Sequence, residues 1–255
     1  MYHRLLDELP ENGSDEHFTL VNEFRKQLKM IDDFGFTPIT FADYQLYLEG
    51  QLELPQKPIV ITFDDGYLDT FEMAVPILLE LGMRAVIFVL GNRNIRRAYW
   101  DESDTTAAAP LMSDSQLREL KSLGFEIGAH SMNHIALADL PDEELEFEIS
   151  ASKKTIEDVL GEPVISISYP YGSIDNRVLS VTSRAGFVFG CGVYTGPPVF
   201  GDNRFDFRRL AVREHIGSTR FLLRLLTPYQ YVEWAYSAVR RFRPLRIRRN
   251  LQSEL

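Results

Sequence analysis

A repeated pattern of short apolar runs, polar motifs and amphipathic stretches restricts the fold more than any other feature of this sequence. The first clear run, residues 58–63, is rich in β-branched side chains and ends at two aspartates. Similar runs follow at residues 85–90, 125–129, 164–168 and 187–193. Runs of this length predict buried strands, and the helical spacing of apolar residues between them predicts helices. The alternation is typical of an α/β fold with a parallel sheet.

Polar motifs follow the predicted strands at the points where these strands end. Asp64 and Asp65 follow the first run, His130 and His134 follow residues 125–129, and Tyr171 follows residues 164–168. Five or more strand-helix units with such motifs predict a barrel, because active sites in barrels gather at the carboxyl ends of the strands. We therefore expect the motifs to meet at one mouth.

The residue types at these strand ends suit a metal site. Two histidines four residues apart and one aspartate leave positions open for water and substrate, a set that fits Zn²⁺ in hydrolases and Fe(II) in oxygenases. The second aspartate favours hydrolysis, because a carboxylate beside the metal can take a proton from water. Each motif also has an ordinary interpretation, since Asp-Asp-Gly is a common turn and a histidine pair at this spacing can arise by chance.

Composition and length predict one soluble domain. The chain has 255 residues, of which 45% are hydrophobic and 25% charged, and this excludes disordered and collagen-like classes. We expect an N-terminal helical extension over residues 1–57, a barrel core over residues 58–213 and a basic C-terminal helical segment over residues 214–255. The one cysteine, Cys191, excludes an intramolecular disulfide. Because the sequence contains no long apolar stretch and no apolar secretion segment at its start, we expect a cytoplasmic protein.

The C-terminal segment carries an unusual charge. Residues 204–255 contain 12 Arg, no Lys and 4 acidic residues, a balance of +8 within a chain of net charge -10. Aromatic residues alternate with these arginines, which fits either a helix docked on the barrel or a helix lying on an anionic membrane surface. Nucleic-acid binding is not expected, because the rest of the chain is acidic and no binding motif accompanies the arginines.

Three motifs together resemble a known family. They are Thr-Phe-Asp-Asp-Gly at residues 62–66, His-Ser-Met-Asn-His at residues 130–134 and Tyr-Pro-Tyr-Gly at residues 169–172. In this order they resemble the first three motifs of the NodB-like polysaccharide deacetylases. The resemblance implies a distorted, incomplete (β/α) barrel of about seven strands.

The resemblance also implies roles for individual residues. Asp65, His130 and His134 would be the ligands of a divalent ion, usually zinc in this family. Asp64 would be the general base that deprotonates the attacking water. The backbone N–H of Tyr171, with the metal, would hold the oxyanion, and such a donor is typically worth about 2.7 to 4 kcal/mol.

Several positions depart from the family pattern. Many relatives carry an arginine where this chain has Ser168, so a basic partner for Asp64 must come from elsewhere. We expect Arg209 to be that partner, and the alternatives are Arg208 or a purely surface role for both arginines. The fifth motif, which supplies the general acid, has no clean match. His215 is the candidate, and protonation through Asp64 or from bulk water are the alternatives.

The sequence therefore predicts a metal-dependent hydrolase that removes N-acetyl groups from N-acetylated hexosamines of a poly-, oligo- or lipid-linked saccharide. Trp100 is expected to stack on a sugar ring, because such a ring presents a flat apolar face. An N-deformylase of a lipid-linked amino sugar would use the same machinery. A sugar-binding or assembly protein that keeps the fold without turnover is the alternative from another class.

Overall fold

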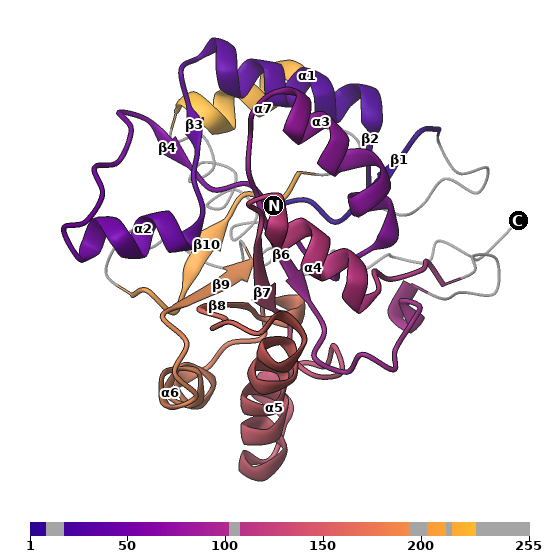
Figure 1. Cartoon of the computed structure of the whole chain (residues 1–255), viewed down its shortest axis with the longest axis vertical. Helices are drawn as coiled ribbons and strands as arrows, with labels where there is room; N and C mark the ends of the chain where they lie inside the picture. Colours follow the sequence, from indigo (N-terminus) through magenta and orange to yellow (C-terminus); the bar gives the residue numbers. More distant parts are fainter. Residues whose placement is uncertain (9–17, 102–107, 194–202, 213–215, 228–255) are drawn as a thin grey trace, which may run out of the picture.

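The centre of the molecule is a curled sheet of six parallel strands (Figure 1). The structure is a computed structural model that describes residues 1–8, 18–101, 108–193, 203–212 and 216–227. The strand order is β10-β9-β8-β7-β6-β5. The bounds are β5 Thr62–Phe63, β6 Val86–Val89, β7 Glu126–Ala129, β8 Ser166–Ser168, β9 Phe189–Val193 and β10 Phe207–Arg209. The expectation of a distorted, incomplete (β/α) barrel is confirmed, with six strands in the described sheet where about seven were expected.

Helices lie around this sheet, and four of them connect successive strands from β5 to β9 (Figure 1). The α-helices are α1 Val21–Asp33, α2 Phe41–Leu48, α3 Val75–Glu80, α4 Asp114–Ser122, α5 Asp142–Leu160, α6 Asn176–Arg184 and α7 Ser218–Leu226. A π-helical turn, Thr70–Ala74, precedes α3, and 3₁₀ turns occupy Tyr99–Asp101, Leu137–Asp139 and Pro170–Gly172. Capping boxes begin α2 and α4, where the side chains of Thr40 and Ser113 accept the backbone N–H three residues on.

Two small parallel pairs of strands lie outside the central sheet. β1 Arg4–Leu6 pairs with β2 Phe18–Leu20, and β3 Thr37–Pro38 pairs with β4 Pro58–Ile59. The single strand expected over residues 58–63 is therefore two strands, because Pro58–Ile59 pairs with β3 while Thr62–Phe63 pairs with β6. The last strand of the sheet, β10, lies outside the apolar runs that predicted the other strands.

The first two residues close the gap between the outer strands of the sheet. The N–H of Tyr2 donates to the Thr62 carbonyl at 2.8 Å, and the Tyr2 carbonyl accepts the N–H of Asp64 at 3.0 Å. On the other side, the Met1 carbonyl accepts the N–H of Val212 at 2.9 Å and the Met1 amino group donates to the Leu210 carbonyl at 2.9 Å. The N-terminal segment thus joins the β5 and β10 sides of the barrel through backbone hydrogen bonds.

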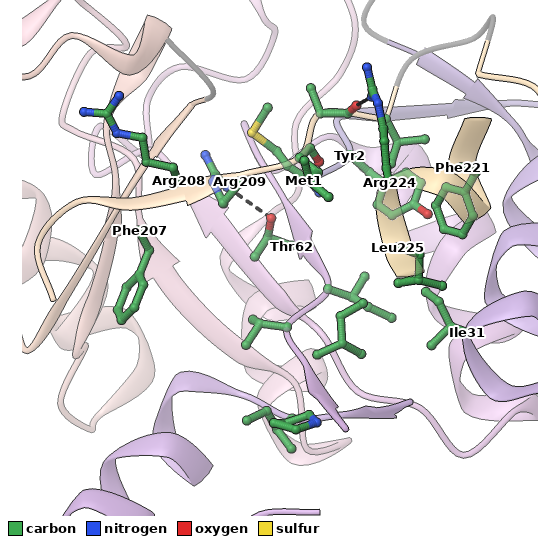
Figure 2. Close-up of a pocket in the computed structure, with 18 of the residues that line it drawn as sticks. Met1, Tyr2, Ile31, Thr62, Phe207, Arg208, Arg209, Phe221, Arg224 and Leu225 are labelled. Atoms are coloured by element: carbon green, nitrogen blue, oxygen red, sulfur yellow. Dashed lines mark hydrogen bonds between the residues drawn. The ribbon is translucent and has the colours of Figure 1, made fainter. Parts of the chain in front are cut away.

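An apolar cavity of about 520 Å³ lies along this closure (Figure 2). Tyr2, Thr62 and Arg209 form part of its wall, and Phe221 and Leu225 of α7 lie on another side.

None of the described helices is both long and apolar enough to cross a membrane. Residues 228–255, which hold most of the arginine-rich segment, lie outside the described residues, so contact with a membrane surface stays a prediction.

The ring of Tyr2 fixes the N-terminal segment against the core. It packs edge-on against Phe24 of α1, with ring centroids 5.1 Å apart, and is stacked on Phe63 at 5.4 Å. Its hydroxyl donates to Oε1 of Gln27 at 2.9 Å, and both side chains are buried. The hydrogen bond is therefore made away from water, where an unpaired polar group is expensive.

We predict that Tyr2→Phe lowers the free energy of unfolding by about 1–3 kcal/mol, because it leaves the buried Gln27 amide without its phenolic donor. Urea unfolding measures the change. Tyr47→Phe, at a side chain 45% exposed on α2, is the matched control and should stay within about 0.5 kcal/mol of wild type. Equal midpoints for the two variants would contradict the packing described here.

Candidate metal centre and catalytic site

Two strand ends bring the candidate ligands together. β5 leads into Asp64, Asp65 and Gly66, and β7 leads into the loop that carries His130 and His134. Asp65 and Gly66 both have positive φ, 73° and 75°. A Cβ at Gly66 would lie 2.9 Å from Cγ1 of Val89 in β6. Glycine is therefore required there both for its conformation and for the close approach of β6.

Asp65, His130 and His134 form a buried cluster of three donor atoms. Oδ1 of Asp65 lies 3.1 Å from Nε2 of His130 and 3.1 Å from Nε2 of His134. The donor atoms of the three residues all lie within 4.8 Å of one another. Each residue is at most 6% exposed. The structure thus brings together the three residues that the sequence analysis predicted as ligands.

The hydrogen bonds around this cluster show why it fits a cation. Nδ1 of His130 lies 2.7 Å from the Ser168 carbonyl, which can only accept, so this nitrogen carries the proton. Neutral His130 therefore turns the lone pair of Nε2 toward Asp65. Oδ1 of Asp65 is buried without a hydrogen-bond partner among the described residues. Facing lone pairs repel unless a positive charge lies between them, so the donor set fits a divalent metal ion.

The pKa shifts of Asp65 and the two histidines agree with a site that favours a positive charge. Burial alone would lower the pKa of His130, but contact with Asp65 and the charge of Asp64 raise it. Burial dominates at His134 and lowers its pKa. Burial alone would raise the pKa of Asp65, but its contacts with both imidazoles hold it well below the ordinary value. The raised pKa of His130 shows that the carboxylates around it favour positive charge at the cluster.

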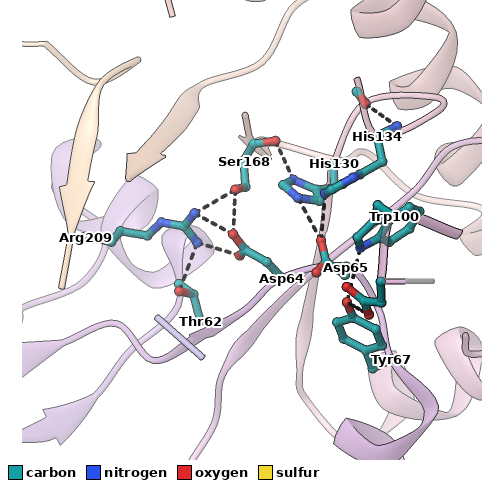
Figure 3. A network of polar contacts seen from close by, with 11 residues as sticks. Thr62, Asp64, Asp65, Tyr67, Trp100, His130, His134, Ser168 and Arg209 are labelled. Carbon is teal, nitrogen blue, oxygen red and sulfur yellow. Dashed lines mark hydrogen bonds and ion pairs between the residues drawn. The ribbon is translucent and has the colours of Figure 1, made fainter. Parts of the chain in front are cut away.

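Asp64 lies beside the cluster and is held by Arg209 (Figure 3). Nη1 of Arg209 donates to Oδ1 of Asp64 at 2.6 Å, and Nη2 donates to Oδ2 at 2.7 Å. The same guanidinium donates to Ser168 Oγ at 2.7 Å and to Thr62 Oγ1 at 3.1 Å. Bidentate pairs of this kind fix orientation as well as charge. Burial would raise the pKa of Asp64, but the Arg209 charge and hydrogen bonds outweigh it and hold the pKa at about 2.

Arg208, the alternative partner, has a different environment. Its guanidinium pairs with Asp206 at 2.8 Å and is partly exposed. Ser168 occupies the position where many relatives carry arginine, and its hydroxyl donates to Oδ2 of Asp64 at 3.1 Å. The short serine side chain thus leaves room for Arg209 to approach Asp64 from β10.

A buried carboxylate from α5 holds the loop between the two histidines. Oε2 of Glu148 accepts the backbone N–H groups of Met132 and Asn133, each at 2.9 Å, and Oε1 accepts Nδ2 of Asn133 at 2.5 Å. The Ser131 hydroxyl accepts the N–H of His134 at 3.0 Å. These bonds fix a loop in which Ser131 and His134 both have positive φ, 59° and 57°.

Aromatic side chains surround His134. The indole of Trp100 is stacked on its imidazole, with ring centroids 3.9 Å apart and 25° between the planes. Tyr171 contacts the imidazole edge-on at 4.8 Å and is 59% exposed, with φ of 57°. Tyr99, 47% exposed, donates its hydroxyl to the Asn133 carbonyl. Two exposed tyrosines therefore lie next to the buried His134 and its loop.

The comparisons with known proteins agree with this geometry. A family model described as polysaccharide deacetylase matches residues 51–190. The Bacillus subtilis protein YxkH is 25% identical over 199 residues, 78% of this chain and 67% of that protein. The peptidoglycan-N-acetylglucosamine deacetylase of Bacillus cereus is 30% identical over 142 residues, 55% of this chain and 59% of that enzyme. The match to the family model covers more than half of the chain.

This chain belongs to the polysaccharide deacetylase family. Among solved structures, the Streptococcus pyogenes deacetylase PplD in complex with acetate is similar in fold, with a TM-score of 0.75 and 21% sequence identity over 89% of this chain and 96% of that one. The NodB-like identity and the barrel that the three motifs predicted are both confirmed.

Two histidines are candidates for the general acid, because the motif that supplies this group in the family has no clean match in this chain. His215 lies outside the described residues, so its role stays a prediction. His3, which follows the closure residue Tyr2, was not among the predicted site residues. Its charge contributes to the lowered pKa of Asp64. The Tyr-His dipeptide at residues 2 and 3 is the sequence feature that contains His3. The pairing of Tyr2 with Phe63 of β5, which brings His3 toward Asp64, is a long-range contact that the sequence does not reveal.

We predict that Arg209→Gln moves the acid limb of the activity profile to higher pH, by roughly one to three pH units. The wild-type pKa of Asp64 lies below its ordinary value because of Arg209, so removing that charge leaves burial, which raises the pKa. The variant therefore loses ionised Asp64 at a pH where wild type keeps it. The measurement is kcat/KM against pH. Arg208→Gln, on the neighbouring residue, is the matched control and should keep the wild-type profile.

Proposed function

We propose that this chain is a metal-dependent carbohydrate N-deacetylase, which hydrolyses the acetamide of an N-acetylated hexosamine to acetate and a free amine. The observation that carries the proposal is the buried Asp65, His130 and His134 cluster next to an ionised aspartate that is not part of it. Membership of the polysaccharide deacetylase family supports the same reaction class. The substrate is a poly-, oligo- or lipid-linked saccharide.

Zinc is the metal we propose for the cluster, and when bound it would supply Lewis-acid activation of water and of the acyl oxygen. Two imidazoles and one carboxylate are a common ligand set of catalytic zinc in hydrolases. The remaining chemistry belongs to side chains and backbone groups of this chain.

Asp64 accepts the proton of the attacking water in the proposed reaction. A new bond then forms between the water oxygen and the acyl carbon. Arg209 and Ser168 hold the carboxylate in one orientation through hydrogen bonds to its oxygens. Oδ1 accepts one of these hydrogen bonds, from Arg209, so its second lone pair can accept the proton. The backbone N–H of Tyr171 donates to the developing oxyanion, a role taken from the family resemblance.

His3 is the proton donor that we propose for the leaving amine. The carbon–nitrogen bond breaks, and the amine nitrogen takes the proton from the imidazole. The ring of Tyr2 packs on Phe63, and alternate side chains of an extended segment point to opposite faces, so His3 is directed to the same face as Asp64. The electrostatic effect of His3 on Asp64 supports this proximity.

The direct test is product analysis on candidate substrates. Chitooligosaccharides, peptidoglycan and lipid-linked N-acetylated hexosamines would be incubated with the zinc-loaded protein, and acetate would be quantified alongside formate from N-formyl analogues. Release of acetate supports the proposal. Release of formate alone would favour the deformylase alternative, and bound zinc without either product would favour a sugar-binding protein.

Asp64→Asn should lower kcat by about 10²–10⁴-fold, because the amide cannot accept the proton. Zinc content should stay at the wild-type level, since Asp64 is not one of the three clustered donors. Asp206→Asn, at a carboxylate paired with Arg208, is the control and should keep activity. Full activity of Asp64→Asn would exclude Asp64 as the base.

His3→Ala should lower kcat by about 10²-fold or more with little change in zinc affinity, because general acids typically contribute at least that much. His215→Ala is the competing variant. A substrate with a better leaving group than an alkylamine, such as an N-acetyl aryl amine or aryl acetate, should restore much of the activity of His3→Ala. If His215→Ala shows the loss and the rescue instead, the acid is His215.

A further inference from the structure

The two imidazoles of the cluster are held by different means. Nδ1 of His130 is bound to the Ser168 carbonyl. Nδ1 of His134 is buried without a hydrogen-bond partner among the described residues. A histidine that ligates a metal almost always donates its second ring N–H to an acceptor, which fixes the orientation of the ring. Some other contact must therefore orient His134.

Trp100 makes the most extensive ring contact with His134. The stack at 3.9 Å, with 25° between the planes, covers one face of the imidazole, while Tyr171 contacts its edge at 4.8 Å. Together these contacts restrict rotation of the ring about its bond to Cβ. The same stack also covers one face of the indole, and that face is not available to a sugar ring.

Trp100 is in turn fixed by a chain of hydrogen bonds. Its Nε1 donates to the Tyr67 hydroxyl at 3.2 Å, and that hydroxyl donates to Oδ2 of Asp101 at 2.5 Å. Tyr67 is 1% exposed and packs in a small apolar cluster with Ala98, Ala109 and Leu111. Figure 3 shows the indole between Tyr67 and His134.

The chain of contacts links two segments that carry metal donors. Tyr67 follows Asp65 by two residues and lies directly after the first motif, while His134 ends the second motif. The indole lies between them and comes from a third segment, the 3₁₀ turn Tyr99–Asp101. Trp100 thus joins the two segments through its contacts with Tyr67 and His134.

We propose that Trp100 is a positioning residue for the metal centre, which orients His134 by stacking and is itself held by Tyr67 and Asp101. The inference rests on the proposed metal-dependent function, and it gives the indole a role beyond the expected contact with sugar. Stacking replaces, at His134, the hydrogen bond that His130 makes to Ser168. The tryptophan therefore acts on metal affinity before any substrate binds.

The test compares Trp100→Phe with Trp100→Leu in the absence of sugar. Phenylalanine keeps a flat face against His134, whereas leucine keeps apolar bulk without it. Zinc affinity is measured by competition with a chromogenic chelator, and the d–d absorption of the Co²⁺-loaded protein reports ligand geometry. We expect Trp100→Leu to weaken zinc binding about 10–100-fold and to alter the Co²⁺ spectrum. Trp100→Phe should stay closer to wild type in both measurements.

Tyr67→Phe tests the support of the indole, because it removes the hydroxyl that joins Trp100 to Asp101. It should weaken zinc binding in the same direction and by less than Trp100→Leu. Phe147→Ala, at a side chain 54% exposed on α5, is the control and should bind zinc as wild type does.

Equal zinc affinity and equal Co²⁺ spectra for Trp100→Leu and wild type would overturn the inference, and a raised KM for the glycan in that variant would then identify Trp100 as a sugar platform. Equal losses in Trp100→Phe and Trp100→Leu would also overturn it, because stacking would then not matter. These measurements need no substrate, so an error in the proposed deacetylation would leave them interpretable. Failure of the wild-type protein itself to bind zinc would refute the metal-dependent function.

Discussion

Three donor atoms held close together in a buried space, one carboxylate oxygen and two imidazole nitrogens, are the constraint on which the rest of the site depends. Asp65 and the two imidazoles approach to 3.1 Å with His130 held in the tautomer that turns Nε2 inward. Such an arrangement is stable only with a positive charge at its centre, either a proton or a metal ion. Asp64 lies beside this cluster, and Arg209 neutralises its carboxylate from the side away from the cluster (Figure 3). The function of Asp64 therefore depends on the positive charge in the cluster.

The backbone strain of the described chain is concentrated in this site. The non-glycine residues with positive φ among the described residues are Asp65, Ser131, His134 and Tyr171, and all of them lie in the three motifs. Left-handed conformations are unfavourable for such residues and persist only when surrounding contacts determine them. Glu148 and the Ser131 hydroxyl supply such contacts at the histidine loop. The surrounding contacts thus keep these residues in a left-handed conformation, and this conformation directs their side chains toward the site.

Much of the architecture follows from local sequence signals, and the remainder depends on long-range contacts. The apolar runs and the helical spacing between them located most strands and helices, and the three motifs contain the residues that form the buried cluster. Periodicity could not show that residues 58–63 divide between two partners, since pairing with β3 and with β6 is decided by tertiary structure. Closure of the barrel by Met1 and Tyr2 has the same origin, because β5 and β10 are about 145 residues apart in the chain. The approach of Trp100 to His134 also arises from a loop whose path the sequence does not specify.

Anomalous X-ray diffraction at the zinc absorption edge, on crystals grown with stoichiometric zinc, tests the central claim most directly. The account predicts one strong anomalous peak within bonding distance, about 2.0–2.2 Å, of the Asp65 carboxylate and of Nε2 of both histidines, with Asp64 outside the coordination sphere. Crystals of His130→Ala should lose that peak. A zinc peak elsewhere in the molecule, with the three side chains bonded only to one another or to water, would contradict the account.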